Sequence, residues 1–316
     1  MSDEIDETAP LNDTTIIIPP QAPAKPVRVS FEFGAQTNIG KVRSKNEDQY
    51  LIARASKGLD ILATSLSEDE RRPLIQSEGY IFLVADGMGG RAGGELASAF
   101  VVNEALRHVM ETAKWFFRLD DPDEDTRIRL LQETLDRADR KLREEAEEDP
   151  TLKGMGTTLT AVSLIGADAF LVHVGDSRAY LLRDDALEQL TTDHTLVREM
   201  VQQGILTPEG ARTHHLRHVI TNVIGGPAGV SGEMAGLQLK DRDRLLLCSD
   251  GLTEPVRDEQ IREILTGYPH PQEACDALVA AALANGGPDN VTVVVAVCTI
   301  ERTAPPGTTT VQHGSA

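Results

Sequence analysis

The chain has 316 residues, with 31 lysines and arginines against 50 aspartates and glutamates, which gives a formal net charge of -19. The length and apolar content suit one large globular domain with tails, and the acidity argues against a nucleic-acid backbone or an anionic membrane as a partner. No apolar run approaches the roughly 20 residues that span a bilayer, and the acidic N-terminal residues are unlike a secretory signal.

Both ends of the chain are poor core formers. Residues 1–30 are rich in proline, threonine and acidic residues, and we expect them and residues 301–316 to be disordered tails around a domain spanning 31–300. The cysteines share no CxxC spacing and have apolar or helical contexts. We therefore expect them to be reduced core residues of a cytoplasmic protein: Cys248, Cys275 and Cys298.

The first ordered segments are predicted strands at 31–37 and 49–54, joined through a turn at 38–40. The long polar stretch 56–78 is interpreted as a surface insertion in a β-hairpin. A buried strand at 80–85 then ends on Asp86, and three glycines follow within four positions, Gly87, Gly89 and Gly90. Because glycine lets a backbone turn sharply, main chain beside this carboxylate can approach an ion or a phosphate closely.

Apolar residues at helical spacing predict helices over 92–113 and 126–148, and Asp149-Pro150 ends the second one. Strand-like segments follow at 157–166, 169–184 and 187–190, then at RLLLCSD and VTVVVAVCTI, with helices expected at about 257–266 and 271–285. Residues 191–227 are polar, rich in histidine and broken by glycine and proline. They predict a surface flap, residues 195–226, that contains two short helices.

Six carboxylates lie at predicted strand ends or turns, flanked by glycine, serine or asparagine. An oxygen-only ligand set favours Mg²⁺ or Mn²⁺ over zinc, and divalent ions would relieve the repulsion among crowded carboxylates. Two such ions about 3.5–4 Å apart would yield a nucleophilic hydroxide at neutral pH. The six residues are Glu47, Asp48, Asp86, Asp176, Asp250 and Asp289.

Eight stretches of the chain, taken in order, resemble the metal-dependent protein phosphatases of the phosphatase 2C (PPM) type in their bacterial form. They cover roughly residues 33–300, and their number and order make coincidence a poor explanation. The stretches are TNIGKVRSKNEDQY, VADGMGG, GMGTTLTA, VGDSRAYLL, LTTDHTLV, TPEGARTHHLRHVITNVIG, LLLCSDGLTE and GPDNVTVVV.

The resemblance implies an α+β fold, a four-layer αββα sandwich in which two central antiparallel β-sheets are flanked by helices. It implies hydrolysis of phosphoserine and phosphothreonine in proteins by metal-activated water, at two core Mn²⁺ or Mg²⁺ ions with a third ion possible. A bacterial serine/threonine kinase and its substrates are the implied partners. We expect a monomer that binds neither nucleic acid nor a membrane.

The resemblance also implies roles for single residues. Asp86 would bridge both metals, the Gly87 carbonyl would bind the second, and Asp250 and Asp289 would bind the first. Glu47 and Asp48 would serve the second metal directly or through water, in a division that the sequence leaves open. Arg43 would grip the substrate phosphate. Asp176 would bind a third metal, although a hairpin cap is the alternative, and Asn290 would order the loop that presents Asp289.

One departure from the family concerns the general acid. Met88 stands where many eukaryotic members carry a histidine, so the acid is a metal-bound water or a histidine elsewhere. His194 either pins the flap or transfers a proton, and we expect His214, His215 and His218 to be solvated flap residues. The main alternative function is a catalytically weak pseudophosphatase, but every acid position is filled. A metal-dependent nuclease or nucleotide hydrolase is disfavoured by the charge and by the lack of a basic groove motif or a P-loop.

Overall fold

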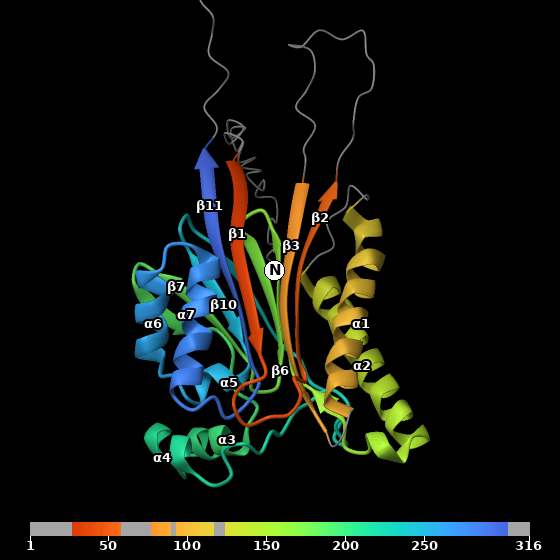
Figure 1. Cartoon of the computed structure of the whole chain (residues 1–316). Helices are drawn as coiled ribbons and strands as arrows, with labels where there is room; N and C mark the ends of the chain where they lie inside the picture. Colours follow the sequence, from red (N-terminus) through yellow and green to blue (C-terminus); the bar gives the residue numbers. More distant parts are fainter. Residues whose placement is uncertain (1–26, 58–76, 90–92, 117–123, 303–316) are drawn as a thin grey trace, which may run out of the picture. The chain divides into compact units, whose positions relative to one another are not determined.

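Two β-sheets lie face to face in the computed structural model, and helices cover both outer faces (Figure 1). The structure describes residues 27–57, 77–89, 93–116 and 124–302. Residues Val29–Ile300 form one compact unit, and most of the expected tails at 1–30 and 301–316 lie outside the described residues. The predicted four-layer αββα sandwich is confirmed.

The first sheet has five strands in the order β1-β11-β10-β7-β8. Where register is defined, its pairs are antiparallel, as in Leu246 opposite Val295 and Leu246 opposite Tyr180. The strands are β1 Val27–Asn38, β11 Val291–Arg302, β10 Arg244–Cys248, β7 Arg178–Arg183 and β8 Ala186–Gln189.

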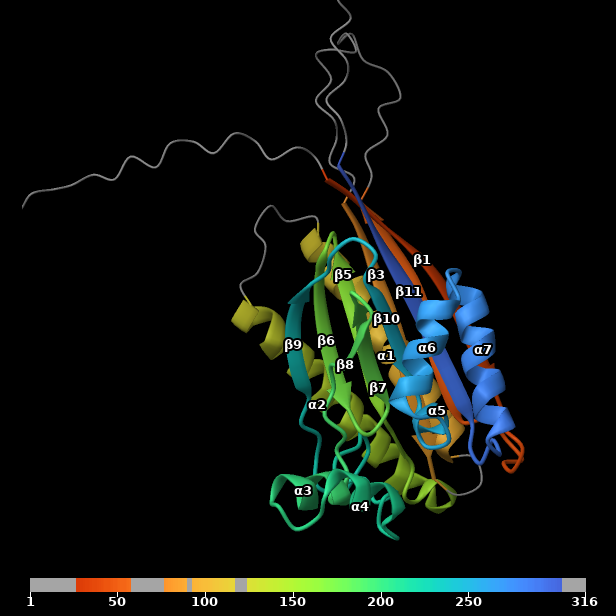
Figure 2. The same cartoon turned by 90° about the vertical axis from the view of Figure 1, so that its left-hand side faces the viewer.

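The second sheet has the order β2-β3-β5-β6-β9, with a short sixth strand, β4, paired with β3. All its pairs are antiparallel, and β9 lies at its free edge (Figure 2). The strands are β2 Asp48–Lys57, β3 Ser77–Met88, β4 Gly156–Thr157, β5 Leu159–Ile165, β6 Asp168–Val174 and β9 Glu233–Gln238.

Helices α1 Gly93–Phe116 and α2 Glu124–Glu148 cover the second sheet, whereas α6 Asp258–Gly267 and α7 Pro271–Ala284 cover the first. Shorter helices connect the layers. They are the 3-10 helix Pro150–Leu152, the flap helices α3 Leu196–Gln202 and α4 Pro208–Thr213, and α5 Asp250–Thr253. No helix in the described ranges is long and apolar enough to cross a membrane.

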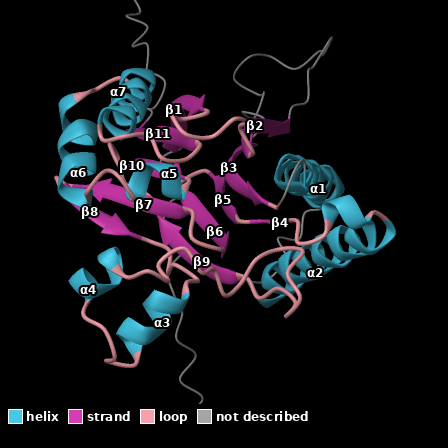
Figure 3. Ribbon diagram, turned by 60° about the horizontal axis from the view of Figure 1, so that its bottom comes forward, coloured by secondary structure: helices cyan, strands magenta, loops and turns pink. Residues whose placement is uncertain are grey.

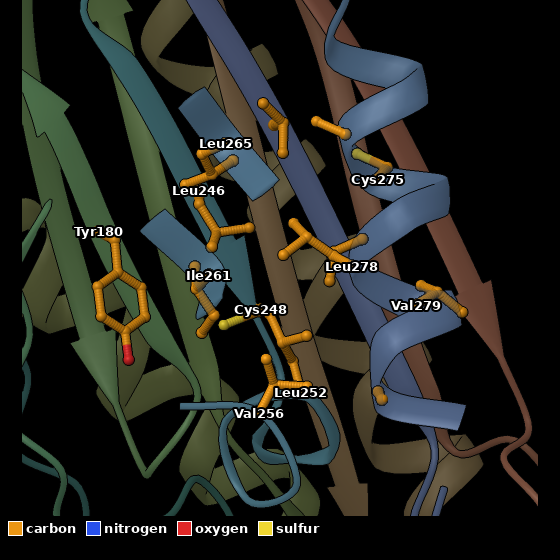
Figure 4. Packing of buried hydrophobic residues seen from close by; sticks show 14 of the residues in the cluster. Tyr180, Leu246, Cys248, Leu252, Val256, Ile261, Leu265, Cys275, Leu278 and Val279 are labelled. Atoms are coloured by element: carbon orange, nitrogen blue, oxygen red, sulfur yellow. The ribbon is translucent and has the colours of Figure 1, made fainter. Parts of the chain in front are cut away.

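Three apolar clusters hold the four layers together, and the central strands contribute to two of them. Val293 and Val295 of β11 face α6 and α7, where Cys275 and Leu278 also pack (Figure 4). Val294, one position along, faces the other sheet. A strand covered on both faces must be apolar at every position, which explains the continuous run VTVVVAV. The third cluster lies between the second sheet and α1 and α2.

Several predicted boundaries differ from the structure. The helices predicted at 92–113 and 126–148 are Gly93–Phe116 and Glu124–Glu148. The strand predicted at 80–85 runs from Ser77 to Met88, because β4 pairs with Gly87 and Met88 beyond Asp86. The strand-like segment 169–184 is two strands in different sheets, β6 and β7, and β9 was not predicted. The hairpin of β2 and β3 is present, but most of its predicted insertion lies outside the described residues.

Candidate metal and phosphate site

Acidic side chains from both sheets come together at one end of the sandwich. Asp48 of β2 lies directly opposite Asp86 of β3. On the first sheet, Asp250 begins α5 two residues after β10, and Asp289 precedes β11. Asp176 occupies the turn that carries the chain from β6 to β7. Figure 3 views the molecule from this end, with α5 near the middle.

The carboxylates at this end of the sandwich raise one another's pKa. Burial raises the pKa of Asp86 well above its usual value, and the charges of Asp48, Asp250, Asp176 and Asp289 raise it further. Burial also raises the pKa of Asp250, with Asp176 and Asp289 as the next contributors. Like charges brought into a low-dielectric site repel one another, so this arrangement disfavours the ionised state unless cations compensate it.

Three carboxylate oxygens at this end are buried without any hydrogen-bond partner among the described residues: Asp48 Oδ1, Asp176 Oδ1 and Asp250 Oδ1. Leaving a buried acceptor unpaired costs about 1–3 kcal/mol, and more when the group is charged. A protein retains such oxygens where another ligand satisfies them. Hard divalent cations take carboxylate and carbonyl oxygens as ligands, so the donor set fits Mg²⁺ or Mn²⁺.

The backbone of Asp86 is fixed by the strand that follows α2. Thr158 Oγ1 accepts a hydrogen bond from the Asp86 N–H at 2.9 Å, and the Thr158 N–H donates to the Asp86 carbonyl at 2.9 Å. Gly87 comes next, and a Cβ on it would lie 2.0 Å from the Gly94 carbonyl oxygen at the start of α1. Only glycine fits there, so the close approach of strand and helix keeps the Gly87 backbone beside the carboxylates.

The structure places Glu47 and Asp48 differently. Asp48 is buried, its Oδ2 accepts a hydrogen bond from Ser249 Oγ at 2.7 Å, and burial raises its pKa to about 6. Glu47 is partly exposed, and its carboxyl group lies against Gly94. Burial raises the pKa of Glu47 as well. Asp48 therefore faces the other buried acids, whereas Glu47 lies at the rim of the site.

Asn290 ties together the loops on which the rim residues lie. Its Nδ2 donates to the carbonyls of Ile39 at 2.9 Å and Lys45 at 2.8 Å, and its Oδ1 accepts from the Glu47 N–H at 2.8 Å. The Asn290 N–H in turn donates to Asp289 Oδ1 at 2.7 Å. One buried amide thus positions the segment that carries Glu47 relative to Asp289.

Arg43 reaches the same group of residues from the loop after β1. Its Nη2 lies 2.5 Å from Asp289 Oδ2, and this hydrogen bond raises the pKa of the guanidinium. The side chain is 55% exposed, so it can also meet a ligand from solvent. A fork of N–H donors beside a cluster of carboxylates suits a phosphate that arrives with, or onto, divalent cations.

The flap contains the two predicted short helices, α3 and α4, which lie beside this end of the sandwich (Figure 2). His218 is exposed, as expected of a solvated flap residue, but it also has a partner in the sandwich. Its Nδ1 lies 2.7 Å from Glu254 Oε1, and the charge of Glu254 raises the pKa of Asp250. His218, Asp250 and Glu254 offer ligand atoms within 4.8 Å of one another. Sequence reasoning missed Glu254, whose only signal was its position four residues after Asp250.

Met88 is the last residue of β3 and pairs with Gly156 of β4. A thioether cannot donate a proton, so the general acid of the expected reaction must be another group.

Residues 63–285 match the family described as Protein phosphatase 2C. The chain is 38% identical over 270 residues to the serine/threonine protein phosphatase PstP of Mycobacterium tuberculosis. The match covers 85% of this chain but only 45% of that relative, so the chain spans less than half of its length. It is 31% identical to the serine/threonine phosphatase stp of Listeria innocua, covering 82% of this chain and 93% of that protein.

The fold is also similar to solved structures. The catalytic domain of PstP, in complex with two manganese ions, matches with a TM-score of 0.67 and 36% identity. The match covers 86% of this chain and all of that one.

Proposed function

The chain belongs to the protein phosphatase 2C family, and on that basis we propose that it hydrolyses phosphoserine and phosphothreonine in proteins at a centre of divalent cations. The observation that carries the proposal is the convergence of buried carboxylates from both sheets, three of which have an unpartnered oxygen. An apolar or neutral core would be the more stable solution there if no cation were bound.

The ligand roles follow from the family resemblance and from the position of each residue. Asp86, opposite Asp48 and followed by Gly87, would hold both core cations, and Asp250 and Asp289 would hold the first. Asp48 contributes from within the site, and Glu47 contributes from its rim. Asp176 would hold a third, weaker cation. Cations bound there lower the pKa of water and so supply a nucleophile at neutral pH.

The remaining residues bind and orient the substrate. Arg43 is proposed to grip the phosphate, exchanging its bond with Asp289 for bonds to phosphate oxygens. Asn290 keeps the loop of Glu47 and the loop of Asp289 in register while this exchange takes place. The pseudophosphatase alternative gains no support, because each acid position is filled and the relatives are named phosphatases.

A bacterial serine/threonine kinase and the proteins that it modifies are the proposed partners, and a monomer is the proposed state. The three cysteines are buried and unpaired, which suits the reducing cytoplasm. Residues 31–300 are the proposed catalytic domain, with the flap at 195–226.

The direct test is hydrolysis of a phosphothreonine peptide by the purified chain with and without Mn²⁺. Activity should require millimolar Mn²⁺ or Mg²⁺, disappear with EDTA and return when the metal is restored. Full activity in metal-free protein would contradict the proposal, and so would inactivity at every Mn²⁺ concentration. Sedimentation velocity on the same sample would test the monomer.

A further inference from the structure

His194 lies between β8 and α3 and binds a single glycine with both its backbone and its ring. The His194 N–H donates to the Gly175 carbonyl at 2.7 Å, and the Gly175 N–H donates to His194 Nδ1 at 3.0 Å. Gly175 has a φ of +108, and a Cβ there would lie 2.5 Å from the Thr158 side chain. Gly175 is therefore fixed between His194 and Thr158, and the next residue along the chain is Asp176.

The other side of this turn contacts Thr158, the residue that fixes the backbone of Asp86. Thr158 Oγ1 is 2.8 Å from Ser177 Oγ and also accepts the hydrogen bond of the Asp86 N–H. The turn 175–177 is thus packed between His194 on one side and the residue that fixes Asp86 on the other. A change in the position of Gly175 would move Asp176 relative to the other acids.

The contacts of the ring define its tautomer. Because the Gly175 N–H points at Nδ1, that nitrogen carries the lone pair and the ring proton is on Nε2. Asn222 Nδ2 lies 3.1 Å from the same Nδ1, in agreement with its role as an acceptor. Nε2 faces Glu233 Oε2 at 3.9 Å, too far for a hydrogen bond. Burial lowers the pKa of His194, which favours the neutral ring that these contacts require.

His173, His194 and Glu233 resemble a metal site, since their ligand atoms lie within 4.8 Å of one another. The hydrogen bonds argue against that use. Nδ1 of His173 meets Thr160 Oγ1 at 2.9 Å, and its Nε2 meets the Thr192 carbonyl at 3.1 Å. The carbonyl can only accept, so Nε2 carries a proton and has no lone pair for a metal.

His194 is also the point where both ends of the flap meet the sandwich. The Thr221 N–H donates to the His194 carbonyl at 2.8 Å, and Thr195 forms a bridge with Ile220. Asn222, which touches the ring, holds the next segment by bonds to the Ser231 carbonyl at 2.6 Å and from the Ser231 N–H at 3.2 Å. The flap and the Gly175 turn therefore share one anchor.

We propose that His194 is a positioning residue that clamps the Gly175 turn through Nδ1, so that Asp176 and the flap are held in one fixed relation to Asp86. This inference rests on the proposed function only in that Asp176 holds a cation that the reaction uses. It assigns the ring no proton transfer. Partners that orient metal ligands from outside the ligand set commonly change metal affinity or activity by about 10–100-fold when they are replaced.

Two substitutions distinguish the roles of the two ring nitrogens. In His194→Asn the amide oxygen can occupy the position of Nδ1 and accept from the Gly175 N–H, whereas in His194→Gln the oxygen reaches only the position of Nε2. The measurements are turnover of a phosphothreonine peptide and Mn²⁺ binding by calorimetry on the full chain. The Mn²⁺ site that depends on Asp176 is identified by its loss in Asp176→Ala. His270→Ala, at the exposed start of α7, is the matched control.

We expect His194→Asn to stay within about threefold of the unmodified protein in both measurements, and His194→Gln to lose about 10–100-fold in both. Equal values for the two variants, or better values for His194→Gln, would overturn the clamp. If the unmodified protein hydrolyses no phosphopeptide, the proposed function fails on its own. The calorimetric comparison of the two variants then still decides whether Nδ1 positions Asp176.

Discussion

Asp86 is the residue at which the acids of both sheets meet. Four other carboxylates raise its pKa, and Thr157 and Thr158 fix its backbone with three hydrogen bonds. Asn has nearly the same shape but lacks the negative charge that a bridging ligand supplies. At the scale of single residues, the charge of the Asp86 side chain therefore matters more than its shape.

We expect Asp86→Asn to lower phosphopeptide turnover by at least about a thousandfold, because the substitution would disrupt the proposed cation centre that generates the nucleophile. Thermal unfolding in EDTA should show no loss of stability, since a buried like-charge repulsion is removed. Steady-state kinetics and a melting curve of the same sample check both statements. A turnover near that of the unmodified protein, in a folded sample, would show that Asp86 is not a ligand of the cation centre.

Arg43 should behave differently, since its side chain is 55% exposed and its proposed role is to bind the substrate phosphate rather than to generate the nucleophile. Arg43→Ala should raise KM for a phosphothreonine peptide by about tenfold or more, as expected for the loss of a charge-assisted hydrogen bond. The value of kcat should change less. Arg43→Lys retains the charge but not the fork, and should recover only part of the loss. A change confined to kcat would assign Arg43 to the chemical step instead.

At the scale of elements, the flap is a surface segment that is anchored to the sandwich at His194 and at the bridge of Ile224 with Thr157. Its two short helices begin with Thr195 and Thr207 as N-caps, and His215 projects from the segment that follows α4. Such a surface segment beside a site can contact a protein substrate that a small substrate never reaches.

We expect His215→Ala to lower kcat/KM for a phosphothreonine peptide by about fivefold, the effect of losing one hydrogen bond or contact of roughly 1 kcal/mol. Hydrolysis of p-nitrophenyl phosphate should be unchanged, because this substrate is too small to touch the flap. The measurement is the ratio of the two kcat/KM values, with His270→Ala as the control. An unchanged ratio across several flap variants would show that the flap does not contribute to recognition of the peptide substrate.

Local patterns predicted much of this architecture, and the failures have a common physical cause. The Asp-Gly pairs at residues 86 and 250 were recognisable because an apolar strand runs into each. The sequence 169–184 reads as one long apolar strand, yet Gly175, with its positive φ, sends its two halves into different sheets. Sheet membership depends on contacts far away in the chain, which periodicity cannot report.

The strand β9 and the contact of His218 with Glu254 were missed for related reasons. The residues of β9, EMAGLQ, include alanine and glycine, which are poor strand formers, and its position at a sheet edge leaves it partly exposed. His218 and Glu254 are 36 positions apart and meet only because the flap returns to α5. Neither pairing leaves a signal within a window of adjacent residues.

At the scale of the whole molecule, the acid cluster joins the two sheets. Asp48 and Asp86 belong to one sheet, whereas Asp250 and Asp289 flank strands of the other. Ser249, next to Asp250, donates a hydrogen bond to Asp48 from one sheet to the other. Without cations, repulsion acts across this boundary and works against the apolar cluster between the sheets. Bound cations should therefore stabilise the folded sandwich in addition to their proposed role in catalysis.

We expect EDTA to lower the melting temperature, and to lower it more at pH 8 than at pH 5. Burial raises the pKa of Asp48 to about 6 and of Asp176 to about 7 in the folded metal-free state, so the folded state binds more protons than the unfolded one. Its stability is then lost as pH rises from about 4 to 7. Scanning calorimetry with and without Mn²⁺ at the two pH values checks this. A metal effect that is equal at both, or larger at pH 5, would contradict it.

At the end of the sandwich away from the acids, the arrangement of the strands should tolerate a change in the order of the segments along the chain. Lys57 of β2 and Ser77 of β3 pair with each other at that end, and Figure 1 shows the start of β1 beside the end of β11. A circular permutant that joins residue 302 to residue 27 and opens between Lys57 and Ser77 would keep every strand pairing of both sheets. Neighbouring termini and a cut between two elements are the conditions under which permutation is tolerated. Such a protein should retain Mn²⁺-dependent phosphatase activity, with its new ends far along β2 and β3 from Asp48 and Asp86.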